Sequence, residues 1–305
     1  MAPGFVDRLT AGEILVADGA TGTSYQQMDL PIGVAPEEWV EDHPERVVGL
    51  HRAFIDAGAD IILTDTFGGT PIRLRETRFA GRAGELNRRA AELASQAAAG
   101  THVLVAGSMG PTGMLMEPLG ELTASAAAGA YAEQAAGLIE GGVDLLLLET
   151  FFALEEALAA IDGVRRVTAS PLVVSFSFDQ GVRTMMGLSP TAMLKAIGPM
   201  GVAAIGANCG RSLDDMVKVV DELASANAGI PLWIKPNAGL PRMDGDVARY
   251  DTTPETMAVF AERFLAAGAQ IVGGCCGSSP AHVAAIAAAA AYYRVGAGGR
   301  HRVRG

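Results

Sequence analysis

Eight short apolar runs recur along the chain, and each is followed by a longer segment with helical periodicity. The runs lie at 14–20, 60–68, 102–110, 144–151, 171–178, 202–210, 231–239 and 269–277. Apolar strands that alternate with helices predict a parallel sheet covered by helices, and eight such units are the number that closes a barrel. We therefore expect an α/β protein with a single (β/α)8 TIM barrel. An open doubly wound sheet is the alternative.

The segments between these runs support one continuous domain. Residues 44–59, 124–142 and 254–269 space their apolar side chains as helices do. No linker rich in Pro, Gly or Ser interrupts the 305 residues, so we expect one domain over 1–305. The basic residues near the end predict a flexible basic tail over 295–305.

The charge and the lengths of the apolar runs argue against nucleic-acid and membrane partners. The formal net charge is −11, which argues against a nucleic-acid partner because no broad basic surface is available for phosphates. No run approaches the roughly 18 apolar residues of a membrane span, and the first residues lack the apolar core of a secretion signal. We expect a cytoplasmic protein without a membrane partner.

The three cysteines stand at the ends of two of the predicted strands. Cys209 ends the sixth run, and Cys275 and Cys276 end the eighth. In a reducing compartment, metal binding or catalysis is a better expectation for them than a disulfide framework. Three thiolates at the carboxyl ends of barrel strands fit a catalytic zinc site with an open fourth position.

Two adjacent cysteines can share one metal only if the backbone bends between them, because neighbouring residues on a strand point to opposite faces. Gly273, Gly274 and Gly277 permit such a bend. Two other interpretations remain open for the cysteines. They are either small buried apolar residues or a vicinal redox pair.

A zinc ion with three thiolate ligands favours one kind of chemistry. The thiolates outweigh the metal charge, so a fourth bound group stays electron-rich. A free thiol has a pKa near 8.5, and coordination deprotonates it while it remains nucleophilic. The ligand set therefore predicts a bound thiol that attacks an activated methyl group.

Carboxylates also occur at strand ends. Asp18 and Glu149 suit the ammonium group of an amino-acid substrate, although Asp18 alternatively bonds the backbone of its own turn. Glu149 follows four leucines, and a carboxylate so placed usually has a partner or a task. The other polar strand-end residues are Asp65, Ser108, Ser177 and Asn237.

With these residues in place, the chain resembles the zinc-dependent homocysteine S-methyltransferase family over nearly its whole length. The matching segments are DGATGT, ADIILTDTFG, GSMGPTG, LLLLETF, GANCG, KPNAGLP and GGCCGSSPAHV. The resemblance implies that Cys209, Cys275 and Cys276 bind zinc and that the homocysteine sulfur takes the fourth position. It also implies that Asp18 and Glu149 contact the substrate amino group. Asn237 would be a pocket residue or an oxygen ligand when substrate is absent.

Within the family, GPTGMLMEPLGEL and KPNAGLP most resemble the homocysteine-binding module of cobalamin-dependent methionine synthase. We expect 305 residues to be too short for that enzyme's folate and cobalamin domains. Asp65 replaces the Asn that is usual in the module's TNTFG motif. This change predicts either stronger ammonium binding or a different thiol.

The resemblance leads to one expected function and leaves alternatives. We expect a zinc methyltransferase that converts homocysteine to methionine. The donor is expected to be methylcobalamin on a separate corrinoid protein, or a small onium compound such as betaine or S-methylmethionine. The alternatives are methylation of another thiol in a demethylation pathway and a non-catalytic zinc-binding barrel.

Overall fold

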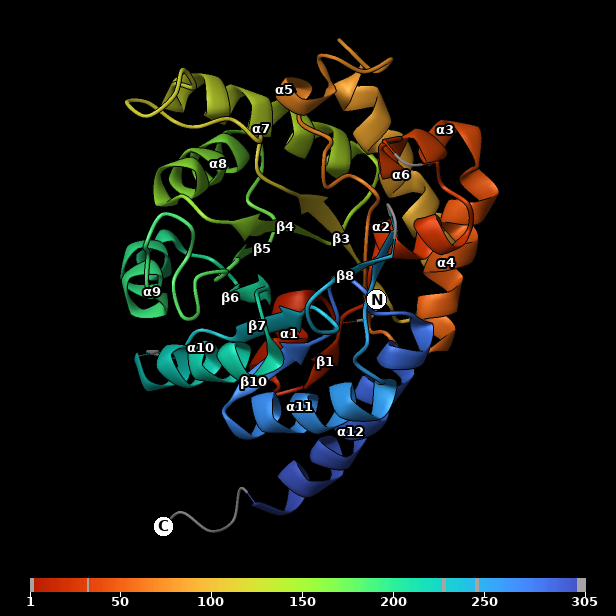
Figure 1. Ribbon diagram of the computed structural model, residues 1–305, viewed down its shortest axis with the longest axis vertical. Coiled ribbons are helices and arrows are strands. Elements are labelled where there is room, and N and C mark those ends of the chain that lie inside the picture. Colours follow the sequence, from red (N-terminus) through yellow and green to blue (C-terminus); the bar gives the residue numbers. More distant parts are fainter. Residues whose placement is uncertain (1–2, 32, 227–228, 245–246, 301–305) are drawn as a thin grey trace.

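Eight parallel strands form a ring in the computed structural model, which describes residues 3–31, 33–226, 229–244 and 247–300 (Figure 1). The strands are β1 (Leu15–Val16), β2 (Ile61–Leu63), β3 (Leu104–Met109), β4 (Leu145–Phe151), β5 (Leu172–Phe176), β6 (Ala204–Cys209), β7 (Leu232–Pro236) and β10 (Ala269–Val272). Their order is β1-β10-β7-β6-β5-β4-β3-β2. A parallel bridge between Ala17 and Ile61 joins the two ends of this order, which closes the barrel.

Helices surround the strands on the outside of the ring, apart from α1, which lies at one end of the barrel (Figure 1). They are α1 (Phe5–Thr10), α2 (Thr21–Gln27), η1 (Pro36–Glu38), α3 (Trp39–Asp42), α4 (Pro44–Asp56), α5 (Pro71–Leu74), α6 (Ala83–Ala98), α7 (Ala124–Glu140), α8 (Leu154–Val167), α9 (Pro190–Ile197), η2 (Gly198–Met200), α10 (Leu213–Ala226), α11 (Pro254–Ala266) and α12 (Pro280–Arg300). A small antiparallel hairpin, β8 (Arg242–Asp244) and β9 (Val247–Arg249), lies in the connection between β7 and α11.

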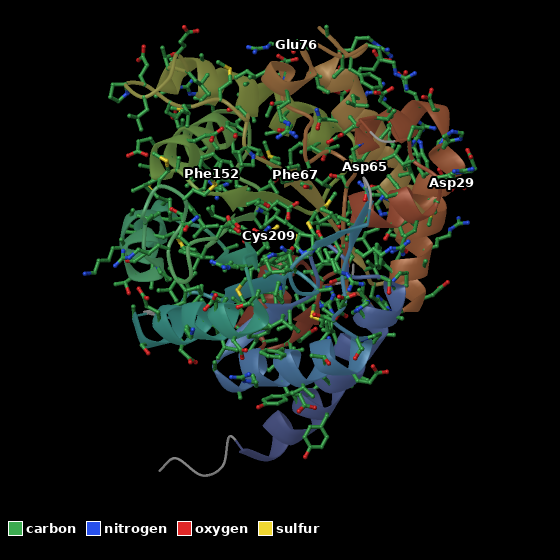
Figure 2. All side chains as sticks on the ribbon, viewed as in Figure 1. Asp29, Asp65, Phe67, Glu76, Phe152 and Cys209 are labelled. Carbon is green, nitrogen blue, oxygen red and sulfur yellow. The ribbon has the colours of Figure 1, made fainter. Side chains whose placement is uncertain are left out.

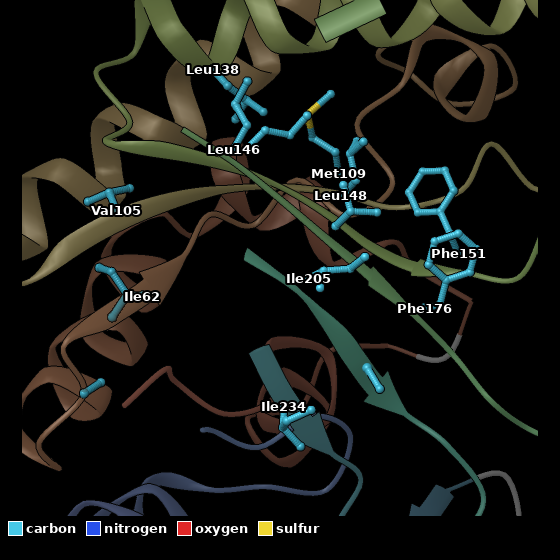
Figure 3. Close-up of a cluster of buried hydrophobic side chains, with 14 of the residues drawn as sticks. Ile62, Val105, Met109, Leu138, Leu146, Leu148, Phe151, Phe176, Ile205 and Ile234 are labelled. Atoms are coloured by element: carbon cyan, nitrogen blue, oxygen red, sulfur yellow. The ribbon is translucent and has the colours of Figure 1, made fainter. Parts of the chain in front are cut away.

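The strands are apolar on both faces because each face is buried. One layer of side chains lies between strands and helices and includes Ile62, Leu146 and Ile234 (Figure 3). A second cluster fills the barrel interior with residues such as Leu147 and Trp233. Side chains buried on both faces require continuous apolar runs, which is the pattern that the sequence shows.

Helix α1 closes the amino-terminal end of the barrel. Its buried residues Phe5 and Leu9 belong to the interior cluster. Arg8 donates to an Asp60 carboxylate oxygen at 3.0 Å and to the His102 carbonyl at 3.3 Å, and both partners lie just before a barrel strand begins. The opposite, carboxyl-terminal end is therefore the one that is left for a site.

The barrel prediction is confirmed, and the open doubly wound alternative is wrong because the ring closes. The last helix continues through Arg300, so residues 295–300 of the expected tail are helical. Residues 301–305 lie outside the described part of the chain, and the flexibility of the tail stays a prediction. Among the described residues, no helix combines the length and apolarity that crossing a bilayer requires.

Candidate functional site

The three cysteine sulfurs converge at the carboxyl-terminal mouth of the barrel. Cys209 is the last residue of β6, and Cys275 and Cys276 follow the end of β10. The Sγ atoms of Cys209 and Cys275 are 3.1 Å apart, and all three Sγ atoms lie within 4.8 Å of one another. Figure 2 shows Cys209 within the ring of strands. The strand-end rule therefore predicted correctly that these residues meet.

The backbone bends as the shared site requires, and it does so after the strand. Strand β10 ends at Val272, and Gly277 adopts a left-handed φ of 81°. Gly273 and Gly274 serve a different purpose, because an added Cβ at either would lie within 2.8 Å of neighbouring atoms. Because they lack a side chain, the segment after β10 can pack closely against its neighbours. The residues of the site that adopt a left-handed conformation are Gly277 and Cys209 (φ 57°).

The cysteine cluster fits a zinc ion by donor type and spacing. A tetrahedral zinc with Zn–S bonds of about 2.3 Å holds its sulfurs roughly 3.8 Å apart, which lies inside the observed spread. Soft sulfur donors favour zinc over magnesium or calcium. All three cysteines are free thiols. Three protein ligands leave one tetrahedral position for a substrate atom.

Hydrogen bonds among the three thiols shift their pKa values in different directions. Thiol donation from Cys209 and Cys275 lowers the pKa of Cys276, since both hydrogen bonds stabilise its thiolate. The hydrogen bond with Cys275, together with burial, raises the pKa of Cys209. The Tyr250 hydroxyl also favours the Cys276 thiolate. The cluster thus favours one thiolate, at Cys276, whereas the pKa values of Cys209 and Cys275 are raised. Tyr250 was not predicted from the sequence.

Asp18 is bound by two groups of the chain itself. Its Oδ1 accepts from the Lys235 Nζ at 2.7 Å, and its Oδ2 accepts from the Leu63 backbone N–H at 2.7 Å. Asp18 and Lys235 are both buried, with 0% and 2% of their surface exposed. Burial raises the pKa of Asp18, and Lys235 opposes that rise.

Lys235 was missed by the sequence analysis because only strand ends were searched. The signal was available, since a lysine inside the apolar run PLWIKP is rarely buried without an anionic partner. The alternative role proposed for Asp18, bonding to its own turn, is replaced by bonds to β2 and β7. Its contact with a substrate amino group stays a prediction.

Glu149 lies near the end of β4 with only 6% of its surface exposed. It accepts a hydrogen bond from the Ser108 hydroxyl at 2.5 Å. Burial raises the pKa of Glu149 to about 7, although Lys235 favours its charged form. The carboxyl group therefore changes charge near neutral pH, and its role towards an ammonium group stays a prediction.

Asn237 links the two cysteine segments through the backbone. Its Nδ2 donates to the Gly210 carbonyl at 3.1 Å, and its Oδ1 accepts from the Cys276 N–H at 3.0 Å. These bonds tie the residue after Cys209 to Cys276. The structure thus gives Asn237 a supporting contact, and its role as pocket residue or oxygen ligand stays a prediction.

Asp65 lies after the end of β2, to the upper right of Cys209 in Figure 2. It is 4% exposed, and its Oδ2 has no hydrogen-bond partner among the described residues. Burial and the neighbouring Glu37 carboxylate raise the pKa of Asp65. Tyr25 is its other electrostatic neighbour, so the structure groups Asp65 with residues of α2 and η1. Its contact with substrate stays a prediction.

A closed (β/α)8 barrel with three thiols at its carboxyl-terminal mouth defines the class of protein, because barrel enzymes carry their active sites at this end. The sequence pattern of the homocysteine S-methyltransferase family matches residues 15–290. The chain belongs to the homocysteine S-methyltransferase family, which confirms the resemblance seen in its motifs.

Similar proteins include two much longer mycobacterial enzymes. The methionine synthase of Mycobacterium tuberculosis is 34% identical over 295 residues, covering 91% of this chain and 25% of that protein. The methionine synthase of Mycobacterium leprae is 34% identical over 298 residues, covering 92% of this chain and 24% of that protein. The chain therefore spans about a quarter of the length of these relatives.

A solved structure supports the fold. The metallated form of the homocysteine methyltransferase MmuM from Escherichia coli superposes with a TM-score of 0.75 at 24% sequence identity. The match covers 92% of this chain and 97% of that one. At this identity the likeness establishes the shared barrel.

Proposed function

We propose that this chain methylates homocysteine to methionine at a zinc ion held by Cys209, Cys275 and Cys276. The observation that carries the proposal is the convergence of three cysteine sulfurs within 4.8 Å at the barrel mouth. The family match over 15–290 makes homocysteine the first acceptor to test. Three free thiols suit a reducing compartment, so a cytoplasmic location is part of this proposal.

Cys209, Cys275 and Cys276 would hold the zinc ion, which would supply Lewis acidity that keeps the acceptor thiol deprotonated at neutral pH. The acceptor sulfur gives an electron pair to the methyl carbon and forms the new S–C bond. The bond between methyl and donor breaks, and the leaving group departs with its electron pair. The protein residues hold the acceptor in place and keep water from competing.

Glu149 and Asp18 are the proposed anchors for the substrate amino group. Glu149 has a pKa of about 7 because it is buried, so a bound ammonium group would stabilise its charged form. Asp18 already pairs with Lys235 at 2.7 Å, and Lys235 therefore sets how much negative charge remains for substrate. We assign Glu149 the stronger substrate contact. Asp65 is proposed as a further acidic residue of the substrate site.

The methyl donor is proposed to be methylcobalamin on a separate corrinoid protein or a small onium compound. The resemblance of GPTGMLMEPLGEL and KPNAGLP to the module of cobalamin-dependent methionine synthase favours the first donor. The loop after β3 contributes to a cavity of about 140 Å³, whose lining includes Met116, Phe152 and Met186. This volume is small against the roughly 300–1,000 Å³ of ordinary ligand pockets. Its lining includes none of the three cysteines, so the size of this cavity does not decide between the donors.

The direct test combines zinc analysis with assays of three donors. Bound zinc is measured first, and methionine formation is then followed with methylcobalamin, betaine and S-methylmethionine in parallel. We expect near-stoichiometric zinc in the wild type. We expect zinc and turnover to be lost in Cys209→Ser, Cys275→Ser and Cys276→Ser, because each removes one ligand.

Ser177→Ala is the matched control for the cysteine variants. Ser177 also follows a barrel strand, but its hydroxyl donates to Asp179 at 2.7 Å. This variant should retain its zinc. Full zinc content together with undiminished turnover in any one of the three cysteine variants would refute the ligand assignment.

A different acceptor thiol is the second candidate, and Asp65 favours it. This carboxylate stands where the related module usually has Asn, and its Oδ2 lacks a hydrogen-bond partner among the described residues. A panel of thiols tested for zinc-dependent proton release separates the two acceptors. If no thiol changed the sulfur coordination of the bound metal, a non-catalytic zinc-binding barrel would be the better description.

A further inference from the structure

The side-chain amide of Asn208 lies between two strand ends of the site. Asn208 precedes Cys209 on β6 and is fully buried. Its Oδ1 accepts from the Thr150 backbone N–H at 2.9 Å and from the Ser175 hydroxyl at 2.6 Å. A backbone N–H can only donate, so the oxygen of the amide must face Thr150 and Ser175. This fixes the direction of the Asn208 Nδ2 group.

The two hydrogens of that Nδ2 group have distinct partners. The Thr150 Oγ1 lies 2.7 Å from Nδ2 and takes one hydrogen. The Cys209 and Cys275 sulfurs lie 3.6 Å and 3.8 Å from Nδ2, within reach of the other. One amide proton is thus shared between two of the three cysteine sulfurs.

Backbone strain indicates that this arrangement is built and held. Thr150 has a φ of 66° and Cys209 a φ of 57°, both in the left-handed region. A β-branched residue such as Thr is a marked outlier there. Such conformations persist only where the surroundings over-determine them, and they concentrate at functional sites. Asn208 bonds both the N–H and the hydroxyl of Thr150, and so holds this strained residue against β6.

We propose that Asn208 is a positioning residue that protects the cysteine sulfurs from the methyl donor. This inference rests on the proposed zinc site. A centre with three cysteine thiolates and an acceptor thiolate offers the donor four sulfurs, yet only the acceptor should be methylated. An N–H hydrogen bond withdraws electron density from a thiolate and lowers its nucleophilicity. Asn208 gives this bond to Cys209 and Cys275, which leaves the acceptor as the more reactive sulfur.

The cost of the unwanted reaction explains why protection is needed. If a cysteine sulfur attacked the methyl carbon, a new S–C bond would form and the leaving group would depart with its electron pair. The product is a neutral thioether, which binds zinc poorly compared with a thiolate. Each such event would remove one ligand from the centre. Cys276 has a different hydrogen-bonding neighbour, the Tyr250 hydroxyl, and therefore serves as an internal reference.

The test compares the methylation of the three cysteines in zinc-loaded protein. Asn208→Asp keeps an acceptor for Thr150 and Ser175 but removes both N–H donors. Ser175→Ala is the matched control, since it removes one bond on the oxygen side of the amide and leaves the nitrogen side intact. Each protein receives limiting iodomethane, and peptide mass spectrometry gives the rate at each cysteine.

We expect the methylation of Cys209 and Cys275, relative to Cys276, to rise about tenfold in Asn208→Asp. The same ratio should stay within about twofold of the wild type in Ser175→Ala. An unchanged ratio in Asn208→Asp with zinc still bound would overturn the role of Asn208 and leave the proposed function intact. A wild-type chain that holds no zinc would count against both.

A measurement on the wild type keeps the test decisive if Asn208→Asp does not fold. In isotope-labelled, cadmium-substituted protein, magnetisation should transfer between the metal and one Asn208 amide proton through a bound sulfur. A merely structural amide would give no such transfer. Its absence in metal-loaded protein would overturn the inference.

Discussion

The buried pair of Lys235 and Asp18 gives the sharpest test of the charge balance at the barrel mouth. Lys235→Met keeps a side chain of similar length and removes the cation. Asp18 then remains as a carboxylate with 0% exposure and only the Leu63 N–H as a partner. Removal of one member of a buried ion pair typically costs about 3–5 kcal/mol.

The size of this loss depends on pH, because Asp18 can respond by binding a proton. An unfolded Asp has a pKa of about 3.9, so holding it protonated in the folded state costs about 4 kcal/mol at pH 7 and about 1.5 kcal/mol at pH 5. The direction of the change in stability with pH follows from the proton that Asp18 binds. When the folded state keeps a proton that the unfolded state releases, stability falls as pH rises above about 3.9. In the wild type, Lys235 opposes the pKa rise that burial causes at Asp18.

Urea unfolding at pH 5 and pH 7, with a chelator present, measures the effect without a contribution from zinc. We expect Lys235→Met to be less stable than the wild type by up to about 4 kcal/mol at pH 7 and by less than half of that at pH 5. The double variant Asp18→Asn/Lys235→Met should recover much of the loss, since position 18 then carries no buried charge. Lys218→Met removes an exposed lysine paired with Asp215 and should leave stability nearly unchanged. An equal loss at both pH values would refute the reasoning.

Two further predictions concern stability. His51 is buried, and burial lowers its pKa to about 4. The unfolded state therefore binds a proton below about pH 6.5 that the native state excludes. The free energy of unfolding should drop by about 3 kcal/mol between pH 6.5 and pH 4. His51→Leu should remove this drop in urea titrations, whereas His43→Gln, at a partly exposed histidine, should retain it, and identical profiles would contradict the assignment. Gly206→Ala would place a Cβ 1.7 Å from the Trp233 carbonyl oxygen and should lower the free energy of unfolding by about 3 kcal/mol or more. Gly129→Ala, in open space on α7, should raise it by about 0.5–1 kcal/mol, and a loss of stability there would count against this comparison.

The barrel was predictable because its constraint is repeated along the whole chain. Each strand is buried on two faces, so the apolar runs are continuous, and each helix shows its own period. The expected runs are longer than the strands. For example, the run at 14–20 contains only Leu15–Val16 as regular strand. In runs such as 60–68 and 269–277, most of the remainder lies after the strand, in the segment that leads towards the next helix.

The cysteine cluster was predictable because parallel strands bring their carboxyl ends to the same edge. The contacts of Asp18 were not, since they depend on which side chains fill the barrel mouth. A lysine two residues before Asn237 reaches Asp18 although β10 lies between β7 and β1, a pairing of residues 217 positions apart. The hydrophobic periodicity of the sequence does not predict such a pair. Only the rarity of a buried, unpaired lysine hints at it.

Asn208 shows why reading strand ends misses supporting residues. In a regular strand, the side chains of Asn208 and Cys209 would point to opposite faces. The left-handed φ of 57° at Cys209 breaks that alternation, so the Asn208 Nδ2 lies 3.6 Å from the Cys209 sulfur. The same local departure occurs at Thr150, directly after Glu149. The residues that hold the site therefore sit next to the predicted ones in sequence, and they are brought in by strained backbone that the hydrophobic pattern does not encode.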